Sequence, residues 1–456
     1  MINLFEYQNK VVADDVDLES LDLFLDEIWV NREVNSFYEE KGGSKVIETQ
    51  RFIQTLNKTN ELKSNKYVGV VQFEGHIINL LPKVFYQEGK KYSKSEIGQM
   101  QNHILWWLSY CRKIKFPSYQ TTLGDVKSDF FEVLIYLFSK YTRKLLATSI
   151  YQNYEEQSSE LNHIKGRLNT NEYIRQNLSK GNWHKLNCSY DAFVMDNKFN
   201  RIIKYVANLL FTVTQNSDNK KYLREILFFL DDVSDEQATA SQCETISFNP
   251  VFEEFTTVRD YCQLFLSNAI SFSYKNELKL FAFLLPMEYV FEDFIFGFIE
   301  RELEDVTAKA QVSSTYLDTK NIFNLKPDLY LKTTSKSIIA DTKYKIIYSD
   351  ESDPKKGISQ NDLYQMLAYA VRFKIDEIIL FYPNTINNYQ EEIAHLTIKD
   401  EWGNGKEINI KAIQVPFLSN DIFDKTLNKK EELKHLFLPL ETSLKDKLNY
   451  ILGNMV

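Results

Sequence analysis

The chain has 456 residues, of which 44% are hydrophobic and 26% are charged, and this composition is typical of a folded globular protein rather than a disordered one. The length predicts two or three domains, because a single hydrophobic core stops growing at about 250–300 residues. The net charge of −9 excludes a protein that coats nucleic acid through bulk electrostatic attraction.

Neither the cysteines nor the hydrophobic segments indicate a secreted or membrane protein. The four cysteines lie far apart and form no Cys-x-x-Cys pair, which predicts neither a disulfide framework nor a zinc site. The N-terminal sequence MINLFEYQNK has no basic region followed by an apolar core, and the most hydrophobic run, residues 278–300, is interrupted by Pro286 and by acidic residues. We therefore expect no signal peptide, no membrane span and a cytoplasmic location.

The first segment, residues 1–125, is predicted to form a β-containing N-terminal domain. Residues 67–85 alternate between apolar and polar side chains around Gly69 and Gly75, which predicts a β-hairpin. Upstream of this hairpin, a Gly-Gly turn at residues 42–43 is flanked by lysines, and this pattern predicts an exposed basic loop.

The middle segment, residues 126–275, is predicted to be helical. Apolar side chains recur every three or four positions in residues 130–150 and again in residues 197–215. Between these helices lies a polar segment around Gly166 and Arg167. The arginine could contact a DNA phosphate, or it could bond a helix end or a carboxylate within the protein.

The last segment, residues 276–456, is predicted to form an α/β domain with a mixed sheet. Pro286 can begin an amphipathic helix, because proline fits the first helical turn. The elements that follow are predicted in the order strand, strand, helix, strand and β-hairpin, at residues 328–334, 337–347, 359–373, 377–383 and 394–415. A helix between two strands implies a crossover connection, and hence parallel as well as antiparallel pairs.

Three polar residues of this domain form a candidate catalytic set. Asp341 and Lys343 are two positions apart on one strand, so their side chains point to the same side. Asp328 begins the preceding strand and comes back beside Asp341 if the chain turns between the two strands. Two adjacent carboxylates repel each other, and a hard divalent cation such as Mg²⁺ relieves the repulsion by taking oxygen ligands from both. The backbone carbonyl of Thr342 could supply another oxygen ligand.

The charge around this set predicts phosphodiester hydrolysis. The Lys343 ammonium could orient or help deprotonate a water molecule and neutralise charge on a phosphate. Residues 321–345 contain five lysines and two aspartates, a local charge of +3, and Lys326 and Lys345 are predicted to contact DNA. The alternative is a surface hairpin with incidental charges.

Two helices could complete the site. Asp362, Gln365 and Tyr369 share one helix face, and the glutamine and tyrosine could hold a water molecule or a DNA phosphate. The alternative is that Asp362 forms a capping box with Ser359 and that Tyr369 is a half-buried aromatic residue.

On the helix that precedes the two strands, Glu292 borders the apolar stripe and could turn a third carboxylate toward the cation. Its alternative is a solvated flanking residue.

The order of the candidate residues along the chain resembles that of the PD-(D/E)xK nuclease superfamily. This order is a helical Glu292, then Asp328, then Asp341-x-Lys343, then a helix with Gln365 and Tyr369. More specifically, the chain resembles the McrC family, the nuclease subunits of McrBC modification-dependent restriction systems. The segments that carry this resemblance lie in the family's order between residues 67 and 383, and they are YVGVVQFEGHIINLLPKVF, IKGRLN, YDAFVMDNKFNRIIKYVANLL, VFEDF, LKPDLYL and ADTKYK.

This resemblance implies a restriction-endonuclease-like C-terminal domain that cleaves DNA. It implies that Asp328 and Asp341 bind the metal ion, that Lys343 is the catalytic lysine, and that Glu292 and Gln365 belong to the same site. The implied cofactor is Mg²⁺, for which Mn²⁺ can substitute.

The resemblance also implies a partner, because McrC-like proteins act with a hexameric AAA+ GTPase that recognises modified double-stranded DNA, and they stimulate its GTP hydrolysis. The sequence contains no GxxxxGK[ST] phosphate loop, so we expect that this chain binds no nucleotide itself. The N-terminal domain would dock on the partner, and the candidate contact residues are Arg32, Lys41, Lys45 and Arg51. An ordinary solvated loop is the alternative for these four residues. A non-catalytic assembly subunit and a stand-alone nuclease are the alternatives for the whole chain.

Overall fold

The computed structural model describes residues 2–31, 50, 52–112, 130–267, 273–275, 278–310, 315–333, 336–347, 355, 358–386, 388–389, 393–400, 406–419 and 433–453. The chain divides into two compact units, one made of residues 1–133 and 267–456 and the other of residues 134–266. The first unit therefore combines both ends of the chain. The division into three domains at residues 125 and 275 stays a prediction.

The N-terminal part of the first unit contains a five-stranded sheet in the order β1-β6-β5-β11-β10 and a three-stranded sheet in the order β2-β4-β3. Its elements are β1 (Ile2–Phe5), β2 (Lys10–Val12), α1 (Leu18–Asn31), β3 (Ile53–Leu56), β4 (Glu61–Ser64), β5 (Tyr67–Phe73), β6 (His76–Leu81), the 3-10 turn η1 (Lys83–Phe85), α2 (Lys94–Tyr110), β10 (Ser273–Lys275) and β11 (Leu278–Pro286). The predicted hairpin is confirmed, because β5 and β6 pair antiparallel around a turn in which Glu74 and Gly75 both have positive φ. The predicted basic loop at residues 42–43 lies outside the described residues.

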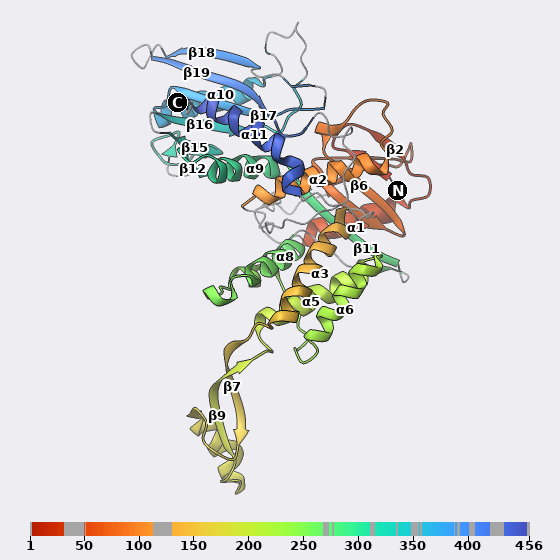
Figure 1. The fold of residues 1–456 in the computed structure, drawn as a ribbon, viewed down its shortest axis with the longest axis vertical. Coiled ribbons are helices and arrows are strands. Elements are labelled where there is room, and N and C mark those ends of the chain that lie inside the picture. The colour runs from red at the N-terminus through yellow and green to blue at the C-terminus, as the bar shows by residue number, and fades with distance from the viewer. Residues whose placement is uncertain are drawn as a thin grey trace. The chain divides into compact units, whose positions relative to one another are not determined.

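The C-terminal part of the first unit contains a six-stranded sheet (Figure 1). The sheet is mixed, as the sequence predicted, but its edge strand β12 was not predicted. Its strand order is β12-β15-β16-β17-β19-β18, in which β16, β17 and β19 are parallel neighbours and the other pairs are antiparallel. The elements are α9 (Met287–Glu302), β12 (Thr307–Ala310), β13 (Thr315–Tyr316), β14 (Asn324–Leu325), β15 (Leu329–Lys332), β16 (Ser337–Thr342), α10 (Gln360–Phe373), β17 (Glu377–Pro383), β18 (Ala394–Asp400), β19 (Lys406–Val415) and α11 (Leu433–Leu452).

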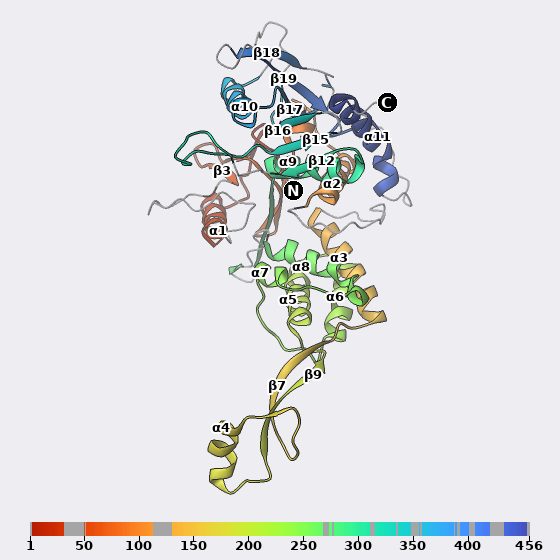
Figure 2. The same ribbon diagram turned by 90° about the vertical axis from the view of Figure 1, so that its left-hand side faces the viewer.

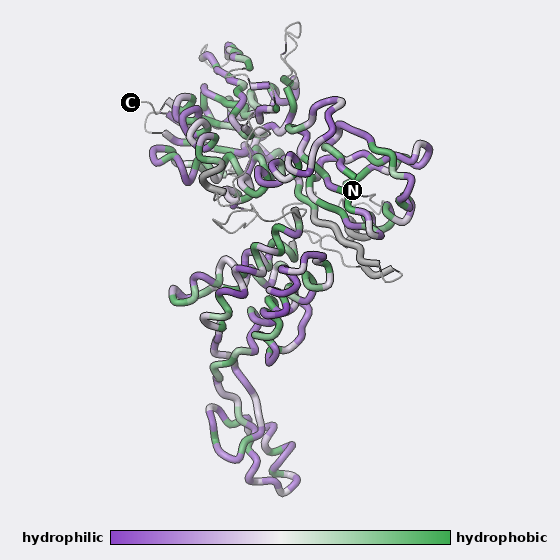
Figure 3. The backbone as a smooth tube through the Cα atoms, turned by 45° about the vertical axis from the view of Figure 1, so that its right-hand side comes forward, coloured by the Kyte–Doolittle hydropathy of each residue, from purple (hydrophilic) through white to green (hydrophobic). Residues whose placement is uncertain are grey.

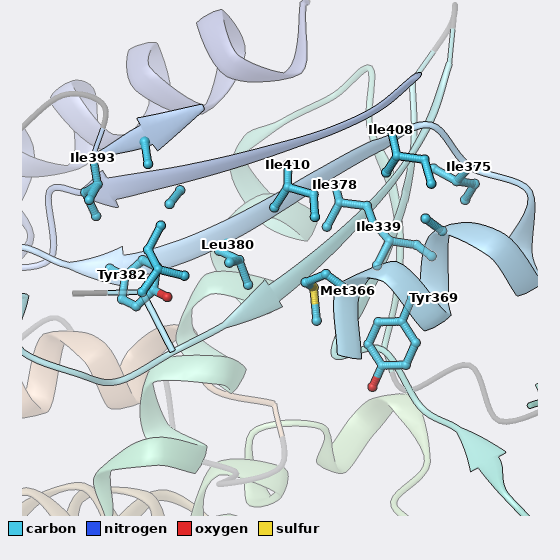
Figure 4. Packing of buried hydrophobic residues seen from close by; sticks show 14 of the residues in the cluster. Ile339, Met366, Tyr369, Ile375, Ile378, Leu380, Tyr382, Ile393, Ile408 and Ile410 are labelled. Atoms are coloured by element: carbon cyan, nitrogen blue, oxygen red, sulfur yellow. The ribbon is translucent and has the colours of Figure 1, made fainter. Parts of the chain in front are cut away.

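Helices cover both faces of this sheet. On one face, Met366 and Tyr369 of α10 pack against Ile339, Ile378 and Ile410 of three neighbouring strands (Figure 4). The alternate residues of β16 on the opposite face are buried as well, and α9 contacts β12 and β16. Burial on both faces explains why the central strands β16 and β17 are nearly continuous runs of apolar residues rather than alternating ones.

The second unit is a helical bundle with a β-ribbon. Its elements are α3 (Phe130–Thr148), β7 (Asn153–Leu161), β8 (Arg167–Leu168), α4 (Thr170–Glu172), η2 (Tyr173–Asn177), η3 (Leu178–Lys180), β9 (Leu186–Val194), α5 (Lys198–Val213), α6 (Ser217–Phe229), α7 (Ala240–Glu244), η4 (Pro250–Phe252) and α8 (Phe255–Ser267). The predicted helices are present, but the segment between them is a long antiparallel pair, β7 with β9, rather than helix (Figure 2). This ribbon is mostly hydrophilic (Figure 3), so its strand pattern is weak in the sequence.

Within the described residues, no helix is both long enough and apolar enough to cross a membrane.

Helix α9 approaches α2 very closely at Gly297, which leads to a first prediction. A Cβ atom at this position would lie 1.9 Å from the carbonyl oxygen of Tyr110. We therefore expect Gly297→Ala to lower the free energy of unfolding by about 1–3 kcal/mol, because the helices must move apart. Urea denaturation followed by circular dichroism measures this change.

The matched control is Gly98→Ala on α2, where a Cβ atom meets nothing within 4 Å. That substitution should stabilise the protein by about 0.5–1 kcal/mol, since alanine favours the helix more than glycine does. A Gly297→Ala protein that is as stable as the Gly98→Ala protein would contradict the close packing of α2 on α9.

Candidate functional site

The pairing of β15 with β16 brings the two predicted aspartates together. Leu329 pairs with Ala340, so Asp328, which directly precedes β15, stands opposite Asp341. One carboxylate oxygen of Asp328, Oδ2, accepts hydrogen bonds from the backbone nitrogen of Thr342 at 2.8 Å and from its hydroxyl at 2.9 Å. These two bonds fix the orientation of the Asp328 side chain at the end of the strand.

The surroundings of the Asp341 carboxyl group oppose its ionisation. Its side chain is 1% exposed, and burial together with the charge of Asp328 raises its pKa to about 7, although Lys343 acts in the opposite direction. Within the described residues, its Oδ2 atom is paired with the Lys343 ammonium at 2.5 Å and accepts no other hydrogen bond. Two adjacent carboxylates, one of them buried and offset by a single ammonium, form a donor set that fits a hard divalent cation.

The Lys343 side chain points to the same side of the sheet as Asp341, as the alternation predicted. Its Nζ lies 2.5 Å from Asp341, 3.3 Å from Oε1 of Gln365 and 3.9 Å from Asp362. Burial by itself lowers the pKa of this amine, but the surrounding carboxylates more than compensate, and the pKa is raised. Lys343 therefore stays an ammonium ion at neutral pH, which favours a role in neutralising and orienting an anion over a role in removing a proton.

Asp362 has a different role from the capping box considered as the alternative. Ser359 is the N-cap residue of α10, but its side chain makes no capping hydrogen bond, so that alternative is wrong. The Asp362 carboxylate instead pairs with the Lys345 ammonium at 2.7 Å and lies near Lys343. The sequence showed that Asp362 and Gln365 share a helix face, but nothing local indicated that two lysines of the strand segment face them.

A chain of hydrogen bonds connects Lys343 to the backbone that precedes Asp328. The Lys343 ammonium donates to Gln365, whose Nε2 donates to the Tyr369 hydroxyl at 2.7 Å, and this hydroxyl donates to the carbonyl oxygen of Lys326 at 3.0 Å. Tyr369 is 3% exposed, so the structure brings it to the site as a buried support for Gln365. The Lys326 side chain is exposed.

The remaining predicted residues are two further candidate metal ligands and the partner contacts. Glu292 is half-buried on α9, and no group of three or more His, Cys, Asp or Glu side chains in the described part of the chain could hold a metal ion. The roles of Glu292 and of the Thr342 carbonyl as metal ligands stay predictions. The four predicted partner contacts, at positions 32, 41, 45 and 51, lie outside the described residues.

Arg167 lies in the other compact unit, on the short strand β8, with its side chain exposed. The preceding Gly166 has a φ of +68°, and a Cβ atom there would lie 2.3 Å from the carbonyl oxygen of Ser189. The glycine is therefore required by the close approach of β8 to β9. The predicted contact of Arg167 with DNA stays a prediction.

The chain is similar to one protein family and to solved structures from one organism. The family model for "McrBC 5-methylcytosine restriction system component" matches residues 62–383. A chain of the structure "Refined half-complex from tetradecameric assembly of Thermococcus gammatolerans McrB AAA+ hexamers with bound McrC" has a TM-score of 0.64 and 18% sequence identity, and the match covers 99% of both chains. This second likeness shows a common fold.

A chain of the "Cryo-EM structure of the Thermococcus gammatolerans McrBC complex" has a TM-score of 0.46 and 18% identity, over 66% of this chain and 88% of that one. No curated protein matches the sequence.

The raised pKa of Asp341 leads to a second prediction. The folded pKa of about 7 lies above the ordinary value of 3.8, so the folded protein holds this proton more tightly than the unfolded chain does. Stability is therefore lost as the pH rises toward 7, and asparagine, which carries no charge, does not have this cost. We expect Asp341→Asn to raise the free energy of unfolding of the metal-free protein by about 1–3 kcal/mol more at pH 8 than at pH 5, because the penalty grows between the unfolded and the folded pKa.

Denaturant titrations at the two pH values measure this difference. The control is Asp376→Asn, which changes an exposed aspartate just before β17 and should alter the free energy of unfolding by less than about 0.5 kcal/mol at both pH values. An equal effect of Asp341→Asn at pH 5 and pH 8 would be inconsistent with a buried, strained carboxylate.

Proposed function

Because the chain belongs to the McrBC 5-methylcytosine restriction system component family, we propose that it is the DNA-cleaving subunit of such a system. Its C-terminal mixed sheet would be a PD-(D/E)xK nuclease domain. The observation that carries the proposal is the set formed by Asp328, Asp341 and Lys343, in which the buried Asp341 carboxylate lies beside Asp328 and is paired with the Lys343 ammonium.

Asp328 and Asp341 would hold Mg²⁺, or Mn²⁺ in its place, and a cation bound there would polarise a phosphate oxygen and help to neutralise its charge. Thr342, through its two hydrogen bonds to Asp328, keeps that carboxylate in position. The loss of the Asp341 proton near pH 7 would give this carboxylate the negative charge that binding a cation requires.

Lys343 would act on the scissile phosphate as a fixed positive charge. Its ammonium is held between Asp341 and Gln365, so it is already oriented before the substrate arrives. Gln365 in turn is held by Tyr369, whose hydroxyl is anchored on the Lys326 carbonyl. Because these hydrogen bonds already hold the side chains in place, little rearrangement is needed during phosphodiester hydrolysis.

Lys326 and Lys345 would contact the DNA backbone beside the site. Both side chains are exposed, and they flank the acidic set on a stretch that has a local charge of +3. Lys345 is paired with Asp362, so part of its charge is already compensated within the protein. We expect these lysines to hold double-stranded DNA through phosphates, without reading its sequence.

Recognition of the DNA would come from a partner. The similar Thermococcus gammatolerans structure contains McrB AAA+ hexamers with bound McrC, and we infer that this chain likewise joins a hexameric AAA+ GTPase. The absence of a GxxxxGK[ST] motif from the sequence supports this division of labour, in which the partner binds GTP and this chain cuts. The family description suggests DNA with 5-methylcytosine as the substrate.

A cleavage assay with the partner tests the proposal and provides a third prediction. Lys343→Ala and Asp341→Ala should each lower the rate of cleavage of methylated DNA by about 100-fold or more in the presence of the partner, GTP and Mg²⁺. Both variants should still stimulate the GTPase activity of the partner, because the changes lie inside the site. Gel analysis of a linear plasmid and phosphate release measure the two activities.

The control is Lys336→Ala, which removes a lysine of the same sheet that pairs with Glu377 outside the site. Its cleavage rate should equal that of the wild type. Cleavage that survives in Lys343→Ala and Asp341→Ala would refute the assignment of the site. If the wild-type chain itself stimulates the GTPase but never cleaves and binds neither Mg²⁺ nor Mn²⁺, it is a non-catalytic assembly subunit.

A further inference from the structure

The residue directly after Lys343 is anchored in the N-terminal part of the same unit. Tyr344 is 4% exposed, and its ring lies near those of Phe291 and Phe417, with centroids 6.0 and 6.3 Å away. Its hydroxyl donates a hydrogen bond to Oε2 of Glu6 at 3.0 Å. The end of the candidate active-site strand is thus bonded to a residue at the end of the first strand of the protein.

Lys83 supports this bond from a second direction. Its backbone nitrogen donates to the same oxygen of Glu6 at 3.2 Å, and its ammonium lies 4.4 Å from the centroid of the Tyr344 ring. The ammonium over the ring face is a cation–π contact, and it also offsets the charge of the nearby carboxylate. Tyr344 is therefore held both at its hydroxyl and at its ring.

Glu6 is an unusual residue for this buried position. It is 1% exposed, and burial raises its pKa to about 7, against the opposing effects of Lys83 and of its hydrogen bonds. The exposed Glu288 at the start of α9 raises this pKa further. An apolar residue would fill such a place at a lower cost in free energy, so a buried carboxyl group with one oxygen that accepts two hydrogen bonds indicates a need for a defined geometry.

The hydrogen bond from Tyr344 to Glu6 also affects the position of Lys343. Lys343 and Lys345 both face Asp362 on α10, so Tyr344 between them faces the opposite way. The backbone nitrogen of Lys343 donates to Phe381, and that of Lys345 donates back to the carbonyl oxygen of Lys343, both at 2.8 Å. In such a tight turn, a rotation of the Tyr344 side chain out of its site would turn the backbone of Lys343 with it.

We propose that Glu6 and Tyr344 are positioning residues that hold Lys343 in place, and the catalytic meaning of this role rests on the proposed function of Lys343. The Tyr344 hydroxyl, bonded to Glu6, prevents the segment after β16 from rotating and keeps the Lys343 ammonium against Asp341. Cleavage then requires the first strand of the chain as well as the nuclease domain.

The reactivity of Lys343 toward acetic anhydride tests this proposal without DNA, metal or partner. In the metal-free full-length chain, Tyr344→Phe removes one hydroxyl and keeps the ring. We expect the Lys343 amine to be acetylated about three- to tenfold faster in this variant, since one hydrogen bond that restrains it is lost. Mass spectrometry of the digested protein measures each lysine separately, and Lys336 and Lys411, both paired with Glu377, serve as internal references.

Two further variants make the result specific. Glu6→Gln retains an oxygen that can accept from Tyr344 and from Lys83, so Lys343 should react as in the wild type. Tyr330→Phe removes the hydroxyl of a half-buried tyrosine on β15 and should also change nothing at Lys343. An unchanged rate at Lys343 in Tyr344→Phe overturns the proposal, and so does a rate that rises equally at Lys336 and Lys411, because that indicates general loosening.

If Tyr344→Phe does not fold, Glu6→Leu removes the acceptor from the other side and should give the same selective increase at Lys343. Failure of both variants to fold would mean that the pair only stabilises the protein, which also overturns the proposal.

With the partner, GTP and methylated DNA, Tyr344→Phe should lower the kcat of cleavage by about tenfold or more, while KM for DNA and the stimulation of the GTPase stay unchanged. An unchanged kcat contradicts the positioning role. If the wild-type chain does not cleave at all, the proposed function fails, and the acetylation of Lys343 still decides whether Glu6 and Tyr344 position it.

Discussion

The rest of the site is arranged around one buried charge, the carboxyl group of Asp341. Burial and the neighbouring Asp328 both oppose its ionisation, and Lys343 favours it. Such a group is unfavourable to the folded state unless something compensates its charge. The structure supplies one compensating cation, the Lys343 ammonium directly after the strand, for two adjacent carboxylates, and a divalent cation would compensate the remaining charge.

The position of β16 in the sheet explains why these groups meet. Its antiparallel neighbour, β15, brings Asp328 to the end of the strand, while its parallel neighbour, β17, requires the crossover helix α10. That helix lies over the sheet and directs Asp362 and Gln365 toward Lys343. The mixed sheet is therefore the reason that one strand end carries residues from three elements.

The same strand end also depends on the first residues of the chain. Glu6 and Tyr344 are 338 positions apart, and nearby the ring of Trp107 on α2 stacks on Phe417 at 3.9 Å and donates its indole nitrogen to the Phe417 carbonyl. These contacts join the N-terminal sheet and the C-terminal sheet into one compact unit. A partner that binds the N-terminal part would thus act on a surface that is connected to Lys343 by a short series of hydrogen bonds and ring contacts.

Local periodicity in the sequence was sufficient for the order of the elements from β15 to β19, for the mixed sheet and for the common direction of Asp341 and Lys343, because alternation along a strand needs no knowledge of its neighbours. It missed the short strands β12, β13 and β14. It did not show that the capping box is absent. The Asp362 side chain pairs with lysines instead of its own helix end, and only the folded sheet brings these two lysines near. It was insufficient for the ribbon β7–β9, whose polar strands are stabilised by pairing with each other. The burial of Asp341 and the bond from Glu6 to Tyr344 were decided by tertiary structure alone, because both depend on which distant residues exclude water from the same place.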